Sequence, residues 1–387
     1  MIKIAKRLES VSSSQTLEIT SIAKALKKQG KDVIDFSAGE PDFDTPEPIK
    51  KAAIYAIESG FTKYTPASGM EELKLAIQNK FLKDNNIRYS PNQIIVSCGA
   101  KHSLYNIIQT ICDPKDEMLI IAPFWLSYPE MVKMADGTPV IIDTDEEKGF
   151  KLKISSLKEK ITKKTKAVIV NSPSNPAGIV YDKKFLQEIA DIVVSKKIIC
   201  ISDEIYEKLI YDGEKHVSIA SLGDDIYRYT VTVNGMSKTY AMTGWRIGYL
   251  GAEPTIAKYI SILQSHSTSN PASISQKAAL RALNVNESIV EKMRAEFEKR
   301  RDYMMTRLDE IKSIHYTRPT GAFYIYCNIY KTKLKSQEFA TKFLEEKLVA
   351  VIPGESFGSD KHIRLSFATD IEKIKEGMDR LEQWVKQ

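Results

Sequence analysis

Long apolar runs, cysteine pairs and glycine-rich nucleotide motifs are all missing from this 387-residue sequence. No window of about 18 consecutive apolar residues occurs, so we expect no membrane-spanning helix. The N-terminal residues MIKIAKRLESVSSS are too polar for a secretory signal peptide. No C-x-x-C pair occurs, which argues against a metal site. We therefore expect a cytoplasmic protein with buried, reduced thiols at Cys98, Cys112, Cys200 and Cys327.

A concentrated charge is missing too. The chain has 56 lysines and arginines against 50 acidic residues, a net charge of +6, and the lysines are spread along it rather than gathered in one arm. This mild basicity favours small anionic ligands and argues against nucleic acid as a partner. Neither G-x-G-x-x-G nor G-x-x-x-x-G-K-[ST] occurs, so a nicotinamide dehydrogenase or a triphosphate-binding enzyme lacks its main motif.

The composition that remains is globular, with 43% hydrophobic and 27% charged residues in a chain long enough for two domains. From residue 94 onward, short apolar strands alternate with helical segments, which predicts a mostly parallel sheet flanked by helices. Beyond residue 254 the sequence is mainly helical and then mixes strands and helices, as a smaller α+β domain would. Strands are expected at residues 94–97, 118–121, 140–142, 167–170, 198–201, 229–233 and 247–250.

The segment 229–250 is the most informative stretch. An apolar strand runs up to the turn signal Asn234-Gly235, and Ser237-Lys238 follows directly. Open α/β sheets bind their ligands at the carboxyl ends of their strands. Arg246 lies eight residues further on. A lysine that acts as a nucleophile needs such a setting, because a nearby cation and partial desolvation lower its pKa.

Other strand ends carry matching groups. Gly99 and Lys101 lie at a helix start directly after a strand, where free N–H groups bind phosphate. Asp203 follows an apolar strand, where a carboxylate either caps the next helix or neutralises a buried cation. Tyr206 lies three residues on, and Trp125 offers a flat face for stacking.

Together these groups describe a phosphorylated pyridinium aldehyde as ligand. Asp203 would pair with the ring nitrogen, Tyr206 with the ring oxygen, and Lys238 would form the imine. Ser237 and Arg246 would hold the phosphate.

Eight segments carry a family resemblance: SAGEPDFDTP (37–46), YTPASGMEEL (64–73), APFWLSYPEMV (122–132), NSPSNPAG (171–178), SDEIYE (202–207), SKTYAMTGWRIGY (237–249), PTGAFY (319–324) and IRLSFA (363–368). With these motifs the sequence resembles the pyridoxal-phosphate-dependent aminotransferases of fold type I. Within them it is similar to the prokaryotic aspartate aminotransferase branch, which includes aspartate/prephenate aminotransferases. The resemblance extends from Lys6 to the C-terminal helix.

This resemblance implies an α/β fold of two domains and a homodimer. The large domain, residues 48–275, would hold a mostly parallel seven-stranded sheet and bind pyridoxal 5'-phosphate. Residues 1–47 and 276–387 would form the small α+β domain. Tyr64 would reach the phosphate in the neighbouring subunit.

The resemblance also implies a role for each site residue. Lys238 would form the aldimine and shuttle the proton, with Asp203 and Tyr206 as its catalytic partners. Asn175 would contact the ring oxygen, and Trp125 would stack on the ring. The phosphate would be held by Gly99, Ala100, Ser237 and Arg246, and Lys101 would also contribute to cofactor binding. The substrate would be bound by Gly39, Lys101, Trp125, Asn175, Thr16 and Arg364, the last of which suits an α-carboxylate.

Substrate choice rests on fewer residues. Lys101 and Thr16 lie where similar enzymes recognise a side-chain carboxylate, which favours aspartate and glutamate as donors and 2-oxo acids such as 2-oxoglutarate and oxaloacetate as acceptors, in a ping-pong reaction. Enzymes that also convert prephenate to arogenate can carry a lysine near position 12, where this chain has Ser12. The main alternative is another fold type I activity, such as an aromatic or alanine-type aminotransferase or a β-lyase.

Overall fold

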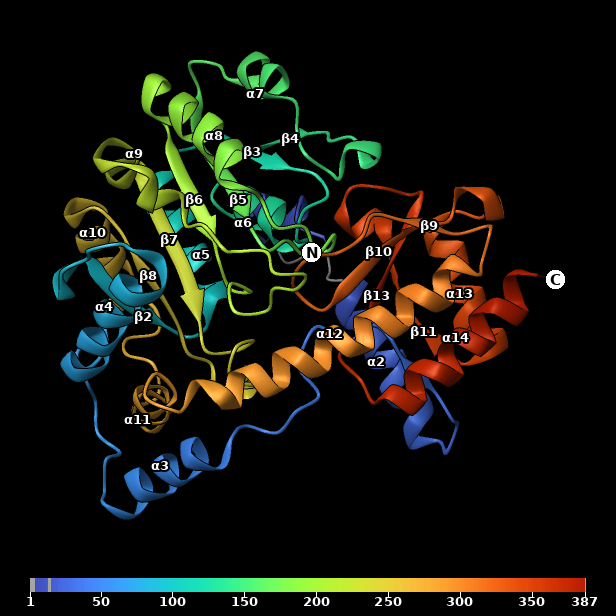
Figure 1. The fold of residues 1–387 in the computed structure, drawn as a ribbon. Helices are drawn as coiled ribbons and strands as arrows, with labels where there is room; N and C mark the ends of the chain where they lie inside the picture. The colour runs from blue at the N-terminus through green and yellow to red at the C-terminus, as the bar shows by residue number, and fades with distance from the viewer. Residues whose placement is uncertain (1–3, 13–14, 387) are drawn as a thin grey trace.

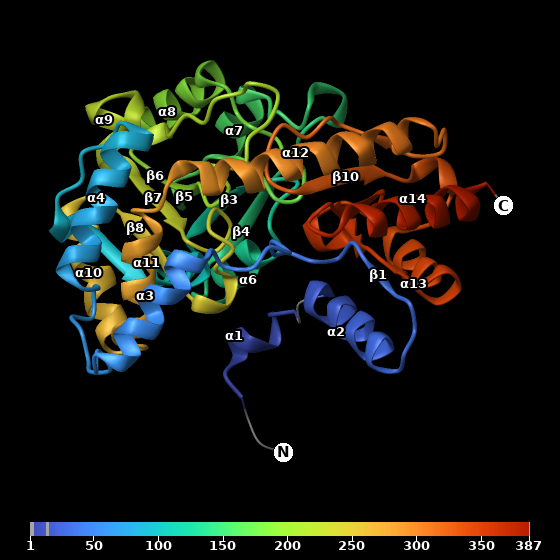
Figure 2. The same cartoon turned by 60° about the horizontal axis from the view of Figure 1, so that its bottom comes forward.

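The computed structural model describes residues 4–12 and 15–386, with residues 15–18 described by their backbone alone. A seven-stranded sheet with its helices forms one part of the molecule, and a smaller group of strands and helices forms the other (Figure 1). The helix α12 (Glu287–Asp309) runs between the two parts, as both views show (Figures 1 and 2).

The large sheet has the strand order β2-β8-β7-β6-β5-β3-β4. Its strands are β2 (Ile94–Ser97), β3 (Glu117–Ile121), β4 (Thr138–Ile142), β5 (Thr165–Asn171), β6 (Ile199–Asp203), β7 (Thr230–Gly235) and β8 (Gly248–Gly251). The neighbours from β7 to β4 pair in parallel, whereas β8 is antiparallel to both β7 and β2. Only β8 therefore runs against the others in this sheet, and the expectation of a mostly parallel seven-stranded sheet is confirmed.

Both faces of this sheet are covered. In β5, Ala167 and Ile169 belong to one hydrophobic core and Val168 and Val170 to another, because successive side chains point to opposite faces. Strands that are apolar on both faces need helices on both, as parallel sheets do. The helices α5 (Ala100–Ile111), α6 (Ser127–Met134) and α10 (Pro254–Ser265) pack on one face, and α8 (Lys183–Lys196) packs on the other.

The smaller part is built around a four-stranded antiparallel sheet of order β12-β13-β10-β9 and a parallel pair of β1 and β11. These strands are β1 (Ile34–Asp35), β9 (His315–Tyr316), β10 (Tyr324–Asn328), β11 (Val349–Ala350), β12 (Ile352–Pro353) and β13 (His362–Ser366). Figure 1 shows α2 (Gln15–Lys28), α13 (Ser336–Lys347) and α14 (Ile371–Val385) beside them.

The remaining helices are α1 (Lys6–Glu9), α3 (Glu47–Glu58), α4 (Glu71–Asn85), α7 (Ile154–Lys160), α9 (Asp224–Tyr229) and α11 (Ser273–Ala282). The short helices α1, α7 and α9 and the strand β9 were not expected from the sequence. Asn234 and Gly235 were expected to end a strand, but both belong to β7, because β8 pairs with them and extends the ladder.

The expectation of four buried cysteines is only partly confirmed, and the domain boundaries are not tested. Cys200 and Cys327 are buried free thiols as expected, whereas Cys98 and Cys112 are only partly buried, because they lie at the edges of α5 rather than inside the sheet. The expected domain boundaries fall in the first turn of α3 and inside α11, and that division stays a prediction. None of the described helices is long and apolar enough to cross a membrane.

Candidate active site

A cavity of about 460 Å³ lies at the carboxyl ends of the strands of the large sheet. Asn171 and Asp203 end β5 and β6, and Lys238 follows β7. The facing wall comes from the smaller part, through Tyr324 of β10 and Arg364 of β13. The cavity therefore collects polar groups from segments far apart in the sequence.

Lys238 is the amine of this cavity. Its Nζ donates a hydrogen bond to the carbonyl oxygen of Gly39 at 2.5 Å. The pKa of Lys238 is lowered to about 8, mainly by burial. The Glu40 carboxylate opposes this shift, and the cations of Arg364 and Arg246 add to it. A lysine with this pKa is partly neutral near pH 8 and can act as a nucleophile or a base.

The loop that carries Gly39 is fixed over the lysine segment. Thr243 donates its hydroxyl to the Glu40 carboxylate at 2.7 Å, and Thr45 donates to the carbonyl of Ala241 at 2.6 Å. Both bonds join residues that are about 200 positions apart in the sequence. They connect the loop to the lysine segment and so restrain both.

Asp203 is the buried acid of the cavity, and its side chain is 4% exposed. Tyr128 donates its hydroxyl to the carboxylate at 2.6 Å, and the amide of Asn171 donates to the backbone carbonyl of Asp203 at 2.9 Å. Burial raises the pKa of the Asp203 carboxyl to about 6, although the Tyr128 hydroxyl opposes the shift. A carboxyl in this setting is stabilised in its charged form by a cationic ligand.

An ionic cluster lies directly behind this acid. Glu204 accepts hydrogen bonds from Ser218 at 2.6 Å and from His216 at 2.9 Å. Glu207 pairs with the buried ammonium of Lys80. Side-chain atoms of Glu204, Glu207 and His216 lie within 4.8 Å of one another, as metal ligands do, but the Lys80 ammonium already pairs with Glu207.

The start of α5 forms an anion-binding corner. Gly99 precedes the helix with φ of 90°, and a Cβ there would lie 2.4 Å from the guanidinium of Arg246. A Cβ at Gly248 would lie 2.1 Å from the backbone nitrogen of Ala100. Both glycines therefore permit the close packing of arginine, helix start and β8. Ser237 also lines the cavity.

Arg246 reaches this corner from a strained backbone. Its φ of 54° is rare for a residue with a side chain, and such conformations gather at functional sites. Its guanidinium donates to the carbonyls of Thr243 at 2.8 Å and Cys98 at 3.3 Å. The helix start and this cation together suit a phosphate group.

Arg364 forms the opposite end of the cavity. Its guanidinium is 2% exposed and donates to the Asn175 side chain and to the backbone carbonyl of Ser37, each at 3.0 Å. Its Nε is buried without a partner, and it makes no ion pair with a carboxylate of the described residues. A buried cation left in this state calls for an anionic ligand.

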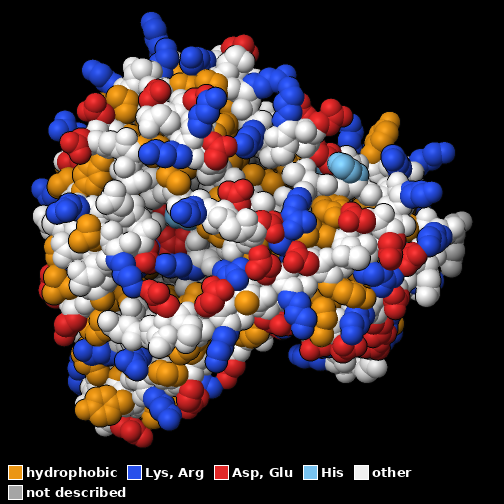
Figure 3. All heavy atoms as spheres, in the orientation of Figure 1, with side chains coloured by type: hydrophobic (Ala, Val, Ile, Leu, Met, Phe, Trp, Pro, Cys, Tyr) orange, Lys and Arg blue, Asp and Glu red, His pale blue; other side chains and the backbone are white. Residues whose placement is uncertain are grey.

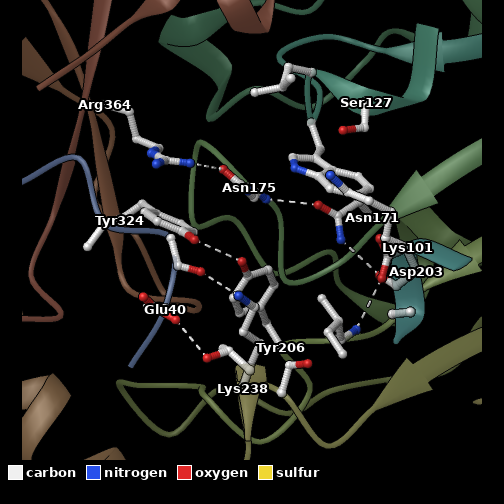
Figure 4. Close-up of a pocket in the computed structure, with 18 of the residues that line it drawn as sticks. Glu40, Lys101, Ser127, Asn171, Asn175, Asp203, Tyr206, Lys238, Tyr324 and Arg364 are labelled. Atoms are coloured by element: carbon white, nitrogen blue, oxygen red, sulfur yellow. Dashed lines mark hydrogen bonds between the residues drawn. The ribbon is translucent and has the colours of Figure 1, made fainter. Parts of the chain in front are cut away.

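A chain of hydrogen bonds joins this end to the buried acid. Dashed lines in Figure 4 run from Arg364 to Asn175, from Asn175 to Asn171 and from Asn171 to Asp203. On the other side of the view, the hydroxyls of Tyr206 and Tyr324 are 2.9 Å apart. Both walls therefore connect groups of the large sheet with groups of the smaller part.

The rim carries an aromatic ring and a second lysine. The Lys101 ammonium lies 4.9 Å from the centre of the Trp125 ring, which in turn packs edge-on against Tyr128 at 5.3 Å. Partial burial lowers the pKa of Lys101, and the Arg246 cation lowers it further. A carboxylate that entered here would meet a cation without an acidic partner among the described residues.

The cavity brings together most of the residues predicted from the sequence. Its lining includes Gly39, Ala100, Lys101, Trp125, Asn175, Asp203, Tyr206, Ser237, Lys238, Arg246 and Arg364, and Gly99 touches Arg246. Tyr64 lies elsewhere, with 91% of its surface exposed. Thr16 belongs to α2, but its side chain lies outside the described residues.

The cavity residues that were not expected from the sequence include Glu40, Tyr128, Asn171 and Tyr324. Tyr128 had a local signal, since it lies three residues after Trp125 and helical neighbours of this spacing share a face. Asn171 ends an apolar strand, which is the same signal that identified Asp203. Tyr324 had no such signal, because its place depends on strand pairing between distant segments.

Known proteins share this fold and much of this sequence. The family model described as "Aminotransferase class I and II" matches residues 31–381. An aspartate aminotransferase of Bacillus subtilis is 46% identical over 389 residues, with 99% of each chain covered. A probable aspartate/prephenate aminotransferase of Aquifex aeolicus is 44% identical over 385 residues, with 98% of each covered. The structure of the Thermus thermophilus aspartate aminotransferase with maleate matches with a TM-score of 0.95 at 38% identity, covering 99% of this chain and 100% of that one.

Proposed function

The chain belongs to the class I and II aminotransferases, and from this premise we propose that it moves the amino group of aspartate or glutamate to a 2-oxo acid. The cofactor would be pyridoxal 5'-phosphate, and the reaction would follow a ping-pong order. The observation that carries this proposal is a lysine of pKa about 8 in the same cavity as the buried acid Asp203.

The donor groups of the cavity fit this cofactor. The cavity volume of about 460 Å³ is within the usual range for a site that encloses a small organic molecule. The corner of Gly99 and Arg246 suits the phosphate, since a Cβ at Gly99 would fill it. Asp203 suits the ring nitrogen, and the unpartnered Nε of Arg364 leaves a place for the substrate carboxylate.

When bound, pyridoxal phosphate supplies an aldehyde that condenses with amines and a cationic ring that withdraws electrons. Lys238 would accept the α-proton as a free amine and return it, as a general base and acid does. Asp203 would keep the ring nitrogen protonated, and its burial strengthens that interaction. Arg364, which Asn175 and Ser37 orient, would bind the α-carboxylate and fix the carbon that loses the proton.

Lys101 supports a dicarboxylic substrate, because its ammonium lies at the rim over the Trp125 ring and forms no ion pair with an acidic side chain of the described residues. The Thermus thermophilus relative was solved with maleate, a four-carbon dicarboxylate. We propose that Lys101 contributes to binding the second carboxylate of aspartate, together with Thr16.

The Lys101→Ala variant should lose aspartate and glutamate activity selectively. We expect kcat/KM for these donors to fall by roughly 10- to 100-fold, because a hydrogen bond to a charged group is lost, and to change little for alanine. Lys163→Ala, a change of an exposed lysine outside the cavity, is the control. An equal loss for alanine and aspartate would show that Lys101 does not select the side chain.

Prephenate is a second candidate acceptor, and the Aquifex aeolicus relative is named for it. Ser12 differs from the lysine that prephenate-accepting enzymes can carry there, and its backbone nitrogen donates to the Glu130 carboxylate at 2.8 Å. A panel of amino donors with prephenate as the acceptor tests this activity directly. Product formation with 2-oxoglutarate but not with prephenate would restrict the enzyme to the first reaction.

We further propose that the enzyme is a homodimer in which Tyr64 reaches the neighbouring site. The loop that carries Tyr64 is held from within, since Gln276 accepts from the Met70 backbone and donates to Thr65, each at 2.8 Å. Ile54, Tyr55 and Ile57 on α3 are more than half exposed, and apolar side chains gather there in Figure 3. A rigid loop beside an apolar helix suits contact with a second copy of the chain.

Two defective chains should then complement each other. In a hybrid dimer of one Tyr64→Ala chain and one Lys238→Ala chain, one of the two sites contains both native residues. Because about half of the dimers in a statistical mixture are hybrids, co-expression should restore activity to about a quarter of all sites. Differently tagged chains allow the hybrid to be purified and assayed. If the hybrid is no more active than the Tyr64→Ala parent, Tyr64 does not act across the interface.

A further inference from the structure

Tyr324 contacts two separate parts of the cavity. Its side chain is 1% exposed, and its strand β10 pairs antiparallel with β13, with Tyr324 opposite Ser366 and Tyr326 opposite Arg364. Tyr324 and Arg364 are thus diagonal neighbours on one face of the sheet, within reach of an aromatic ring and a long side chain. Strand pairing alone therefore brings this ring to the arginine.

The ring of Tyr324 supports the guanidinium of Arg364. The guanidinium carbon lies 4.2 Å from the ring centre, closer than to the ring of Phe357 at 5.1 Å. Two guanidinium nitrogens of Arg364 donate hydrogen bonds to Asn175 and Ser37. The ring of Tyr324 then restricts the rotation that these two bonds leave to the guanidinium. A cation held against an aromatic face in a dry site is strongly attracted to it.

The hydroxyl of Tyr324 contacts the other part of the cavity. It lies 2.9 Å from the hydroxyl of Tyr206 and 3.7 Å from the position that a Cβ on Gly39 would take. A phenol has one hydrogen to donate. If Tyr206 donates that hydrogen to a ligand, Tyr324 must be the donor in the bond between the two hydroxyls.

We propose that Tyr324 is a positioning residue for both ends of the substrate site. Its ring holds Arg364 in the orientation that binds the α-carboxylate, and its hydroxyl directs the hydrogen of Tyr206 toward the cofactor. This inference rests on the proposed function and adds a residue that acts through Arg364 and Tyr206.

Two substitutions separate the two contacts. Tyr324→Phe keeps the ring and removes the hydroxyl, whereas Tyr324→Leu removes both. Tyr326→Phe is the matched control, since Tyr326 is equally buried on the same strand and donates to the Gly354 carbonyl at 3.3 Å. The holoenzymes are titrated with maleate, a dicarboxylate that carries no amino group, and the visible absorbance of the bound cofactor is recorded against pH.

Tyr324→Leu should weaken maleate binding by about tenfold, because Arg364 loses the ring. Tyr324→Phe should bind maleate within about threefold of wild type, yet shift the pH titration of the cofactor absorbance upward, because Tyr206 no longer stabilises the deprotonated form. Tyr326→Phe should change neither quantity. If Tyr324→Leu does not fold, Tyr324→Met replaces it.

Each failure has a distinct meaning. Unchanged maleate affinity in Tyr324→Leu overturns the role of the ring, and an unchanged pH titration in Tyr324→Phe overturns the role of the hydroxyl. Wild-type protein that neither takes up pyridoxal phosphate nor binds maleate would instead refute the proposed function.

Discussion

Lys238→Ala protein should fail to attach pyridoxal phosphate covalently and should lose transamination by at least ~10⁴-fold, because one side chain supplies both the nucleophile and the general base. Borohydride treatment followed by mass spectrometry reads out the attachment, and a stopped-flow assay reads out the activity. Lys238 is the expected residue because its pKa is lowered to about 8, mainly by burial, and because it lines the same cavity as Asp203.

Lys101, another lysine that lines the cavity, supplies the control. Lys101→Ala should still attach the cofactor, since the Lys101 ammonium lies over Trp125 at the rim. In wild-type protein the attachment rate should rise with pH and level off above about 8, because only the neutral amine of Lys238 reacts. Labelling of Lys238→Ala at the wild-type rate would transfer the central role to another amine.

Asp203→Asn should cause the second largest loss. The substitution keeps the shape of the side chain but removes the buried charge that would oppose the cationic ring. Loss of one partner of a buried charge pair costs roughly 2–5 kcal/mol, or ~30- to ~4,000-fold in kcat/KM. Steady-state kinetics with aspartate and 2-oxoglutarate measure this effect.

Tyr128→Phe gives a graded comparison at the same acid. The hydroxyl of Tyr128 donates to the charged form of Asp203 and holds the pKa of that carboxyl down against burial. Its loss should raise that pKa above about 6 and reduce activity mainly at acidic pH, by roughly 10-fold. Equal activity of Asp203→Asn and wild type would remove Asp203 from the mechanism.

The sequence predicted the part of the site that follows the large sheet. Gly99, Asp203 and Lys238 each come directly after an apolar strand, and parallel strands bring their carboxyl ends to one edge. The alternation of strands and helices predicted that arrangement, and the sheet order confirms it. The resemblance then added Asn175 and Arg364, which also line the cavity.

The missed residues depend on contacts that the local sequence does not encode. Tyr324 reaches Arg364 through the pairing of β10 with β13, and no short pattern in either strand specifies that register. Glu40 is fixed by Thr243, some 200 residues away in the chain. The reversed direction of β8 was also not predicted, because an apolar strand reads the same in either orientation.

That reversal determines how the nucleophile and the phosphate-binding arginine are linked. β7 and β8 form a hairpin, with Gly235 opposite Gly248. The residues that connect them therefore lie beyond one end of these two strands. Lys238 and Arg246 thus lie in the same connecting loop, and this loop does not contain the crossover helix that parallel strands require. An insertion or deletion in residues 239–245 would alter the spacing of both groups at once.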